Sequence, residues 1–255
     1  MNNYTHYDAI GKGYPLVLVH GLGGNLQSWY VIAERLAHRF RVYRYDLRGH
    51  GESHNPDGPW CLDDFVEDLH RLLQTIGIQT THLAGFSLGG LIVQGLALRY
   101  PALVNQLAII SAVAGRTQEE RERVAIRVQN LEQGDLYANI ELAMDRWFTP
   151  QFRSQHPERV AQRIATLKRN DPEGYLNAYR VFNLSDLADD LHQIEAETLI
   201  MTGEDDPGSN SRMARLMHHR IRNSRLEILP GLRHSLLVEA PELVSDKLDA
   251  FFNEP

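Results

Sequence analysis

The sequence predicts an α/β fold in which a mostly parallel, doubly wound sheet carries a helical insertion. Three observations support this prediction. Short, nearly all-apolar segments of strand composition recur along the 255 residues. Longer segments of helical periodicity separate most of them. Residues 112–191 show helical periodicity only. Strands that alternate with helices need right-handed crossovers, and these build a parallel sheet covered on both faces.

The predicted strands are runs in which almost every residue is apolar, as expected where both faces of a parallel sheet are buried. They lie at 15–20, 41–46, 82–86, 107–111, 198–203 and 226–229. The helices predicted between them lie at about 26–39, 62–76, 88–100, 209–221 and 241–252. The N-terminal stretch Tyr4–Ile10 is predicted to supply one more strand.

The alternation of strands and helices stops between Ala112 and Leu191. Helical periodicity continues through this segment, with breaks at Gly134, Pro150, Pro157 and Pro172. We therefore expect a core formed by residues 1–111 and 192–255, with a helical cap formed by 112–191 inserted into it.

Composition argues against several classes of protein. The net charge is −7, and the local clusters of basic residues are interleaved with Glu, so nucleic acid is not an expected partner. Cys61 is the one cysteine, which excludes an internal disulfide and a thiolate metal cluster. The N-terminus lacks the pattern of a signal peptide, and no apolar run approaches the ~20 residues of a membrane helix. A cytoplasmic protein without a membrane partner is therefore predicted.

Ser87 is the predicted nucleophile. It stands in Gly85-Phe86-Ser87-Leu88-Gly89, which matches the pattern G-x-S-x-G. An apolar strand is predicted before this motif and an amphipathic helix after it, which is the context in which a sharp turn exposes the serine hydroxyl. Gly85 and Gly89 are explained sterically, because side chains there would collide across the turn.

A serine hydroxyl needs a neighbouring base at neutral pH, and His234 is the predicted base. His234 follows the last predicted strand and directly precedes the final helix, so it is placed to reach back over Ser87. The acid that orients the imidazole is expected in Glu204-Asp205-Asp206, because such a triad runs in the order Ser, acid, His. The residues alone leave this choice open. The chemistry needs neither a metal nor a cofactor.

The loop His20-Gly21-Leu22-Gly23-Gly24 follows the first buried strand. A backbone N–H from such a loop, with the N–H of the residue after the nucleophile, binds the oxyanion in hydrolases of this kind. Leu22 and Leu88 are therefore the predicted donors. We interpret His20 as structural, bonding within its loop. We also interpret residues 46–53 mainly as a structural loop with Arg48 paired internally.

Two side chains of the insertion are candidates for substrate binding. Arg146 would clamp a substrate carboxylate, and Trp147 would form an apolar wall. The alternative is that both only pack within the cap. Cys61 is interpreted as a small buried residue, not a nucleophile, because nothing near it in sequence would activate its thiol.

In combination, these motifs resemble the α/β-hydrolase superfamily. The loops H-G-L-G-G, D-L-R-G-H-G-E-S, G-F-S-L-G-G, G-E-D-D and G-L-R-H occur in that order. The insertion looks most like that of the 3-oxoadipate enol-lactonase group, at residues 146–153, 171–175 and 178–187. The resemblance implies the α/β-hydrolase fold with an inserted helical lid. It also implies that the acid is Asp206, the third residue after the strand-ending glycine.

The expected activity is hydrolysis of a small carboxylic ester or enol-lactone through an acyl-enzyme, with a small molecule as the only expected partner. A C–C bond or amide hydrolase acting on small acidic ring-cleavage products would use the same triad. A non-catalytic small-molecule receptor on this fold is a third alternative. The sequence does not determine the natural substrate or the oligomeric state.

Overall fold

The computed structural model describes residues 4–133 and 140–252. At its centre is a seven-stranded sheet with the order β1-β3-β2-β4-β5-β6-β7. Neighbouring strands are parallel, apart from the antiparallel pair β1–β3. The strands are β1 (Tyr7–Ile10), β2 (Tyr14–Val19), β3 (Phe40–Tyr45), β4 (Thr81–Phe86), β5 (Val104–Ile110), β6 (Glu197–Gly203) and β7 (Ser224–Leu229). This topology confirms the predicted fold class.

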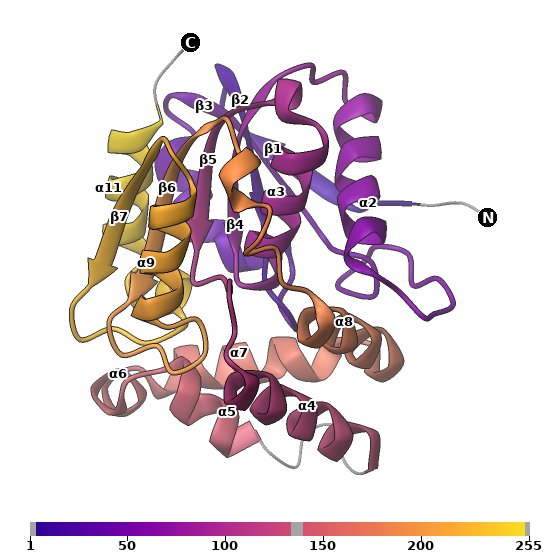
Figure 1. The fold of residues 1–255 in the computed structure, drawn as a ribbon, viewed down its shortest axis with the longest axis vertical. Helices are drawn as coiled ribbons and strands as arrows, with labels where there is room; N and C mark the ends of the chain where they lie inside the picture. The colour runs from indigo at the N-terminus through magenta and orange to yellow at the C-terminus, as the bar shows by residue number, and fades with distance from the viewer. Residues whose placement is uncertain (1–3, 134–139, 253–255) are drawn as a thin grey trace.

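Helices cover both faces of the sheet (Figure 1). The core helices are η1 (Leu26–Trp29), α1 (Tyr30–Leu36), α2 (Leu62–Thr75), α3 (Leu88–Arg99), η2 (Pro101–Leu103), η3 (Leu191–Gln193), α9 (Ser211–Arg220), α10 (Leu236–Glu239) and α11 (Pro241–Phe251). The helix predicted at 26–39 was too long: it begins as a 3-10 turn and ends at Leu36, because Phe40 already starts β3. Among the described helices, none has the length and hydropathy needed to span a membrane.

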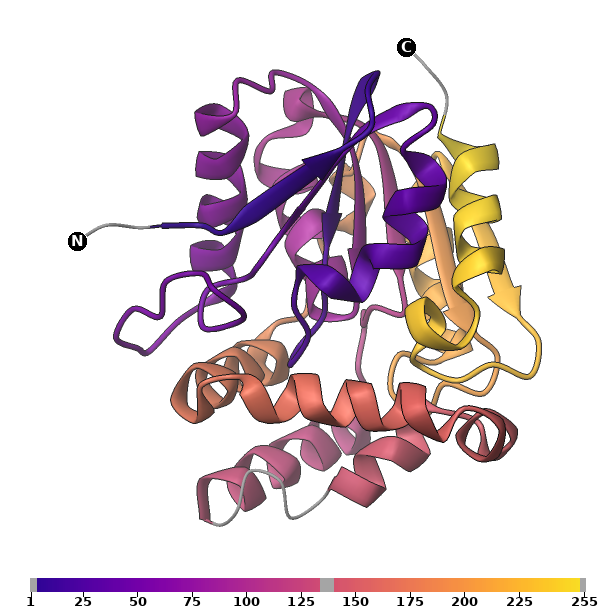
Figure 2. The ribbon, with the colours of Figure 1, turned by 180° about the vertical axis from the view of Figure 1, so that it is seen from behind.

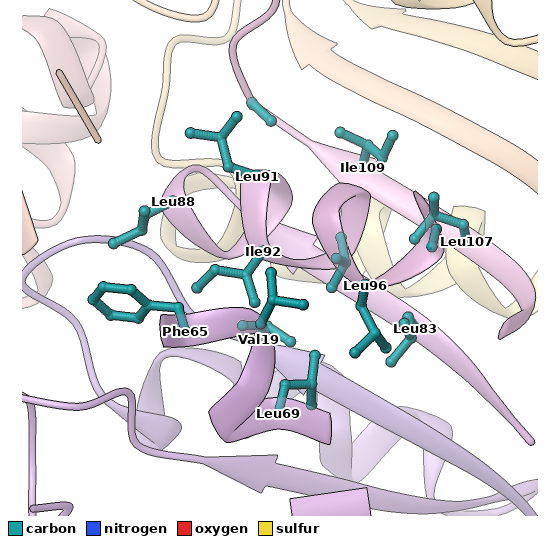
Figure 3. Packing of buried hydrophobic residues seen from close by; sticks show 14 of the residues in the cluster. Val19, Phe65, Leu69, Leu83, Leu88, Leu91, Ile92, Leu96, Leu107 and Ile109 are labelled. Atoms are coloured by element: carbon teal, nitrogen blue, oxygen red, sulfur yellow. The ribbon is translucent and has the colours of Figure 1, made fainter. Parts of the chain in front are cut away.

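Alternate residues of β2 point to two separate hydrophobic clusters, as the period of a strand requires. Val17 and Val19 pack in the cluster that contains α2, α3 and α9. Figure 3 shows Val19 beside Ile92 of α3 and Leu69 of α2. Leu16 and Leu18 belong to the opposite cluster, which contains α1 and α11. Figure 2 shows α11 and α1 in front of the sheet on this side. Burial on both faces fixes the sheet rigidly, and with it the strand ends that carry the site.

The insertion between β5 and β6 contains helices and connecting loops, with no strand among its described residues. Its helices are α4 (Gln118–Gln133), α5 (Ile140–Trp147), α6 (Pro150–Gln155), α7 (Pro157–Arg169) and α8 (Pro172–Leu184). The three prolines expected to break helices each begin one, where a missing N–H costs nothing. The predicted break at Gly134 lies outside the described residues. These helices lie beyond the carboxyl ends of the strands (Figure 1), and we propose that they form the cap predicted for 112–191.

The prediction for Cys61 was wrong, because its side chain is exposed. Cys61 is the N-cap of α2, and its backbone N–H donates to the Asp64 carboxylate at 2.8 Å. The neighbouring Trp60 is the residue that is buried, at 8% exposure. The first turn of a helix at the molecular surface thus keeps the thiol in solvent.

Candidate active site

Ser87 lies in the turn between β4 and α3, with the backbone angles φ 56° and ψ −114°. A positive φ is unfavourable for a residue with a side chain, so the surrounding structure must enforce it. The Ser87 N–H donates to the carbonyl of Ile110 at 2.9 Å, and its own carbonyl accepts from the N–H of Gly90 at 2.9 Å. The strained turn predicted from the motif is therefore present.

The two glycines of the motif allow backbone segments to approach closely. A Cβ at Gly85 would lie 2.2 Å from the carbonyl oxygen of Gly89. The reason at Gly89 differs from the one predicted: its Cβ would lie 2.2 Å from the carbonyl oxygen of Val19, at the end of β2, and not across the turn. Because both clashes are with backbone, neither could be relieved by a rotamer change.

The structure brings Ser87, His234 and Asp206 together. The Nε2 atom of His234 is 3.2 Å from the Ser87 hydroxyl, and its Nδ1 atom is 2.7 Å from Oδ2 of Asp206. The side chain of Asp206 is 1% exposed and that of His234 is 15% exposed. Three segments separated along the chain, which follow β4, β6 and β7, therefore contribute one side chain each.

The geometry also distinguishes Asp206 from its two acidic neighbours. Its Oδ1 atom accepts hydrogen bonds from the backbone N–H groups of Gly208 at 2.8 Å and Ser209 at 3.0 Å, which leaves Oδ2 for His234. Glu204 and Asp205 are both exposed. A buried carboxylate bound to Nδ1–H fixes the imidazole tautomer and leaves Nε2 free to accept the serine proton.

The loop after β2 packs directly against the Ser87 turn. A Cβ at Gly21 would lie 3.0 Å from the Cβ of Ser87, so only glycine permits this approach. In the described part of the chain, no hydrogen-bond acceptor is recorded for the backbone N–H of Leu22 or of Leu88. Leu88 is the first residue of α3, where the helix dipole favours negative charge. Both N–H groups predicted as oxyanion donors are thus unused by the protein itself.

Two buried histidines bind the backbone of this loop through hydrogen bonds. His20 contacts the Gly21 carbonyl through Nδ1 at 2.8 Å and accepts the Leu47 N–H through Nε2 at 3.0 Å. His50 contacts the Arg48 carbonyl through Nδ1 and accepts the Gly23 N–H through Nε2, both at 3.0 Å. Burial lowers the pKa of both rings, and that of His50 falls to about 3 because a proton on either ring would also repel a proton on the other. Both rings are therefore neutral in the folded protein.

The loop 46–53 is built as expected from internal pairs. Arg48 is buried and donates to the carboxylate of Asp68 at 2.7 Å. Asp46 accepts the N–H of Leu26 at 2.7 Å and that of Glu52 at 2.9 Å. These contacts hold the loop in place beside the site.

A pocket of about 820 Å³, partly open to solvent, lies over Ser87. Both predicted binding residues, Arg146 and Trp147, are in its wall. Its apolar lining includes Leu22, Phe86, Val113, Val124, Ala143, Tyr175, Tyr179 and Phe182. The pocket thus lies between the core and the inserted helices.

The charge of the pocket was missed in the sequence analysis. Arg116, Arg127 and Arg163 line it together with Arg146, while the carboxylate in its described lining is that of Asp206. Burial lowers the pKa of Arg116 and of Arg163 to about 10, so both remain cationic at neutral pH. One signal was available: Arg163 stands on the same face of α7 as the buried residues Val160 and Leu167. Arg127 carries a similar signal, because it stands three residues after the buried Val124 of α4, whereas Arg116 precedes that helix.

Arg127 and Arg146 lie close enough for their positive charges to repel each other. Burial lowers the pKa of Arg146, and the like charge of Arg127 lowers it further. An anion placed between two such cations relieves their repulsion and gains charge-assisted hydrogen bonds. The electrostatics of the pocket therefore favour a negatively charged ligand.

Comparison with known proteins gives concordant results. Residues 14–241 match the family model of the alpha/beta hydrolase fold. The chain is 34% identical to (E)-2-((N-methylformamido)methylene)succinate hydrolase of Acinetobacter baylyi, covering 98% of this chain and 94% of that protein. It is 30% identical to 3-oxoadipate enol-lactonase 2 of the same organism, over 97% and 91%. The crystal structure of the enol-lactonase from Burkholderia xenovorans LB400 superposes with a TM-score of 0.92 at 26% identity, covering 98% of this chain and 96% of that one.

The depressed pKa of His50 predicts how stability changes with pH. The pKa of this ring is 6.5 in the unfolded chain and about 3 in the folded protein. The free energy of unfolding is therefore highest above about pH 6.5 and falls as the pH is lowered, by up to ~1.4 kcal/mol per pH unit for this group. His20 acts in the same direction. His50→Gln keeps an uncharged acceptor for the Gly23 N–H and is expected to reduce the slope measured by urea unfolding between pH 6.5 and 5.

His192→Gln is the matched control, because His192 is exposed and its ring contacts the nearby carbonyl of Asp189. We expect this variant to keep the wild-type slope. An unchanged slope in His50→Gln would contradict the assignment of His50 as a buried neutral ring.

Proposed function

Because the chain belongs to the α/β-hydrolase fold family and is a hydrolase, we propose that it cleaves a small, negatively charged carboxylic ester or enol-lactone through an acyl-enzyme on Ser87. One observation carries this proposal. The hydrogen-bonded series Ser87–His234–Asp206 opens into a pocket lined by four arginines.

The proposed reaction has two half-reactions. The Ser87 oxygen attacks the substrate carbonyl while His234 Nε2 accepts its proton, and Asp206 stabilises the resulting imidazolium. The N–H groups of Leu22 and Leu88 hold the oxyanion. When the tetrahedral intermediate collapses, His234 returns the proton to the leaving oxygen. Water, activated by the same imidazole, then hydrolyses the acyl-enzyme and releases the acid.

The arginines support an acidic substrate. Arg127 and Arg146 are both half-buried, so a carboxylate between them would be partly removed from water, where charge-assisted hydrogen bonds are stronger. The names of the two relatives also contain dicarboxylates, a substituted succinate and an oxoadipate. Trp147 and the tyrosines of the pocket would contact the apolar part of such a molecule.

An amide bond is the second candidate. It is favoured by the 34% identity to a hydrolase whose named substrate carries an N-methylformamido group. The same triad serves both bonds, but the leaving nitrogen must receive a proton from His234 before it departs. A substrate series with one acyl group and either an ester or an amide leaving group would separate the candidates. A dienone acid added to the series would report C–C bond hydrolysis.

Removal of the nucleophile is expected to abolish turnover. Ser87→Ala should lower kcat by at least ~10³-fold on p-nitrophenyl esters and prevent labelling by a fluorophosphonate probe. Asp206→Asn should lower kcat by up to ~10⁴-fold, because the imidazole loses its fixed tautomer. Asp205→Asn is the matched control, since Asp205 is exposed, and it should retain wild-type kcat. Labelling that persists in Ser87→Ala would refute the proposed mechanism.

Loss of a pocket arginine is expected to affect anionic substrates selectively. Arg146→Met should raise KM for the p-nitrophenyl monoester of succinate by about 10- to 100-fold, corresponding to one charge-assisted contact. The KM for neutral p-nitrophenyl acetate should change less than about twofold. Arg123→Met, on the exposed surface of α4, serves as the control for net charge. An equal change in KM for both esters would mean that Arg146 only shapes the pocket.

A further inference from the structure

Arg163 links the inserted helix α7 to the loop that follows β2. Its Nη1 atom donates to the Gly23 carbonyl at 2.9 Å and its Nη2 atom donates to the Leu22 carbonyl at 3.1 Å. The guanidinium also lies over the ring of Trp147 at 4.2 Å. A side chain of the insertion therefore binds the backbone that carries the predicted oxyanion donor.

We propose that Arg163 is a positioning residue, which fixes the Leu22–Gly23 peptide and thereby the direction of the Leu22 N–H toward the oxyanion. This inference rests on the proposed hydrolysis through Ser87. Under this proposal the cap has a second role besides lining the pocket, because the loop that carries Leu22 has all of its hydrogen bonds only when α7 packs against it.

Peptide geometry explains how the contact acts. In a trans peptide the C=O and the N–H point in opposite directions. The Gly21 carbonyl is held by His20 and by the N–H of Gly24, which directs the Leu22 N–H the other way. The next peptide is held at its N–H by His50 and at its C=O by Arg163. Both peptides that flank the Leu22 Cα are thus fixed, and without Arg163 the second is fixed at one end only.

The hydrogen bonds of Arg163 add to the packing of a buried loop. A Cβ at Gly23 would lie 2.6 Å from Leu167 of α7, so the loop and the inserted helices are in close contact. Gly23 has a φ of +68°, and glycine crosses between backbone conformations at little cost. A second cavity, partly open to solvent, lies beside the loop and is lined by Gly21, Leu22, Arg163 and residues of α10. On that side the hydrogen bonds, and not neighbouring side chains, hold the backbone.

Arginine is suited to this task in a way that lysine is not. Its planar fork donates from two nitrogens to two neighbouring carbonyls at once, whereas the three donors of an ammonium radiate from one compact nitrogen. Within the described residues, the recorded partners of Arg163 are these two carbonyls and the Trp147 ring, with no carboxylate. Asn170, at the end of α7, adds a donor to the Gly23 carbonyl at 3.2 Å.

The test compares kcat and KM for a neutral and an anionic ester. Arg163→Met keeps the aliphatic stem but loses both donors, and kcat should fall about 10- to 100-fold on both p-nitrophenyl acetate and the succinate monoester. The KM values should change less than about threefold. The inhibition constant of a trifluoromethyl ketone, whose adduct carries an oxyanion, should rise in parallel with the loss of kcat, while inhibition by the product acid stays the same.

Two further variants complete the experiment. Arg163→Lys should give a kcat between those of the wild type and Arg163→Met. If Arg163→Met does not fold, the kcat of Arg163→Lys relative to the wild type tests the proposal by itself. Arg169→Met, on the exposed end of the same helix, should match the wild type. A loss confined to KM for the anionic ester would identify Arg163 as a substrate ligand and overturn the proposal, as would an unchanged kcat. Failure of the Ser87 mechanism is recognised separately, by probe labelling that persists in Ser87→Ala.

Discussion

The close approach of the Ser87 turn to the end of β2 is the constraint on which the rest of the site depends. Gly89 leaves no room for a side chain against the Val19 carbonyl, and Gly21 leaves almost none against Ser87. The serine in this closely packed turn has a positive φ, and its side chain lies beside the loop that carries Leu22. The strain is tolerated because β2 and β4 are hydrogen-bonded neighbours buried on both faces. A rigid sheet edge thus holds a strained turn that an isolated segment would not adopt.

Most of the positive charge in the pocket comes from the inserted helices. The chain as a whole has a net charge of −7, yet the pocket concentrates four guanidinium groups, three of them on α4, α5 and α7. Coulomb attraction is stronger in such a partly desolvated cleft than on an open surface. We propose that the core breaks the bond, while the insertion selects an anion and, through Arg163, also contacts the loop of the predicted oxyanion donor.

Local patterns were sufficient to predict the strands and most helices of the core, and two of the three central side chains, Ser87 and His234. Buried strands, the glycines around Ser87 and the order of Ser, acid and His are properties of short segments, so a single sequence reveals them. Resemblance to a family was needed to choose Asp206, because only the fold shows that Asp205 faces solvent. Arg146 was the one pocket arginine named from the sequence; the convergence of Arg116, Arg127 and Arg163 on the same pocket was missed, since it depends on how helices far apart in the chain pack. Cys61 was misplaced for a related reason, as its exposure depends on where the first turn of α2 meets the surface.

The central claim is that the Ser87 oxygen becomes covalently acylated during turnover. Acid quenching of the enzyme with a slowly deacylating ester, followed by mass spectrometry of its peptides, tests this claim most directly. The acyl mass should appear on the peptide that contains Ser87, accumulate within the first turnover and disappear as substrate is exhausted. Turnover without an adduct, or an adduct on another residue, would contradict the claim.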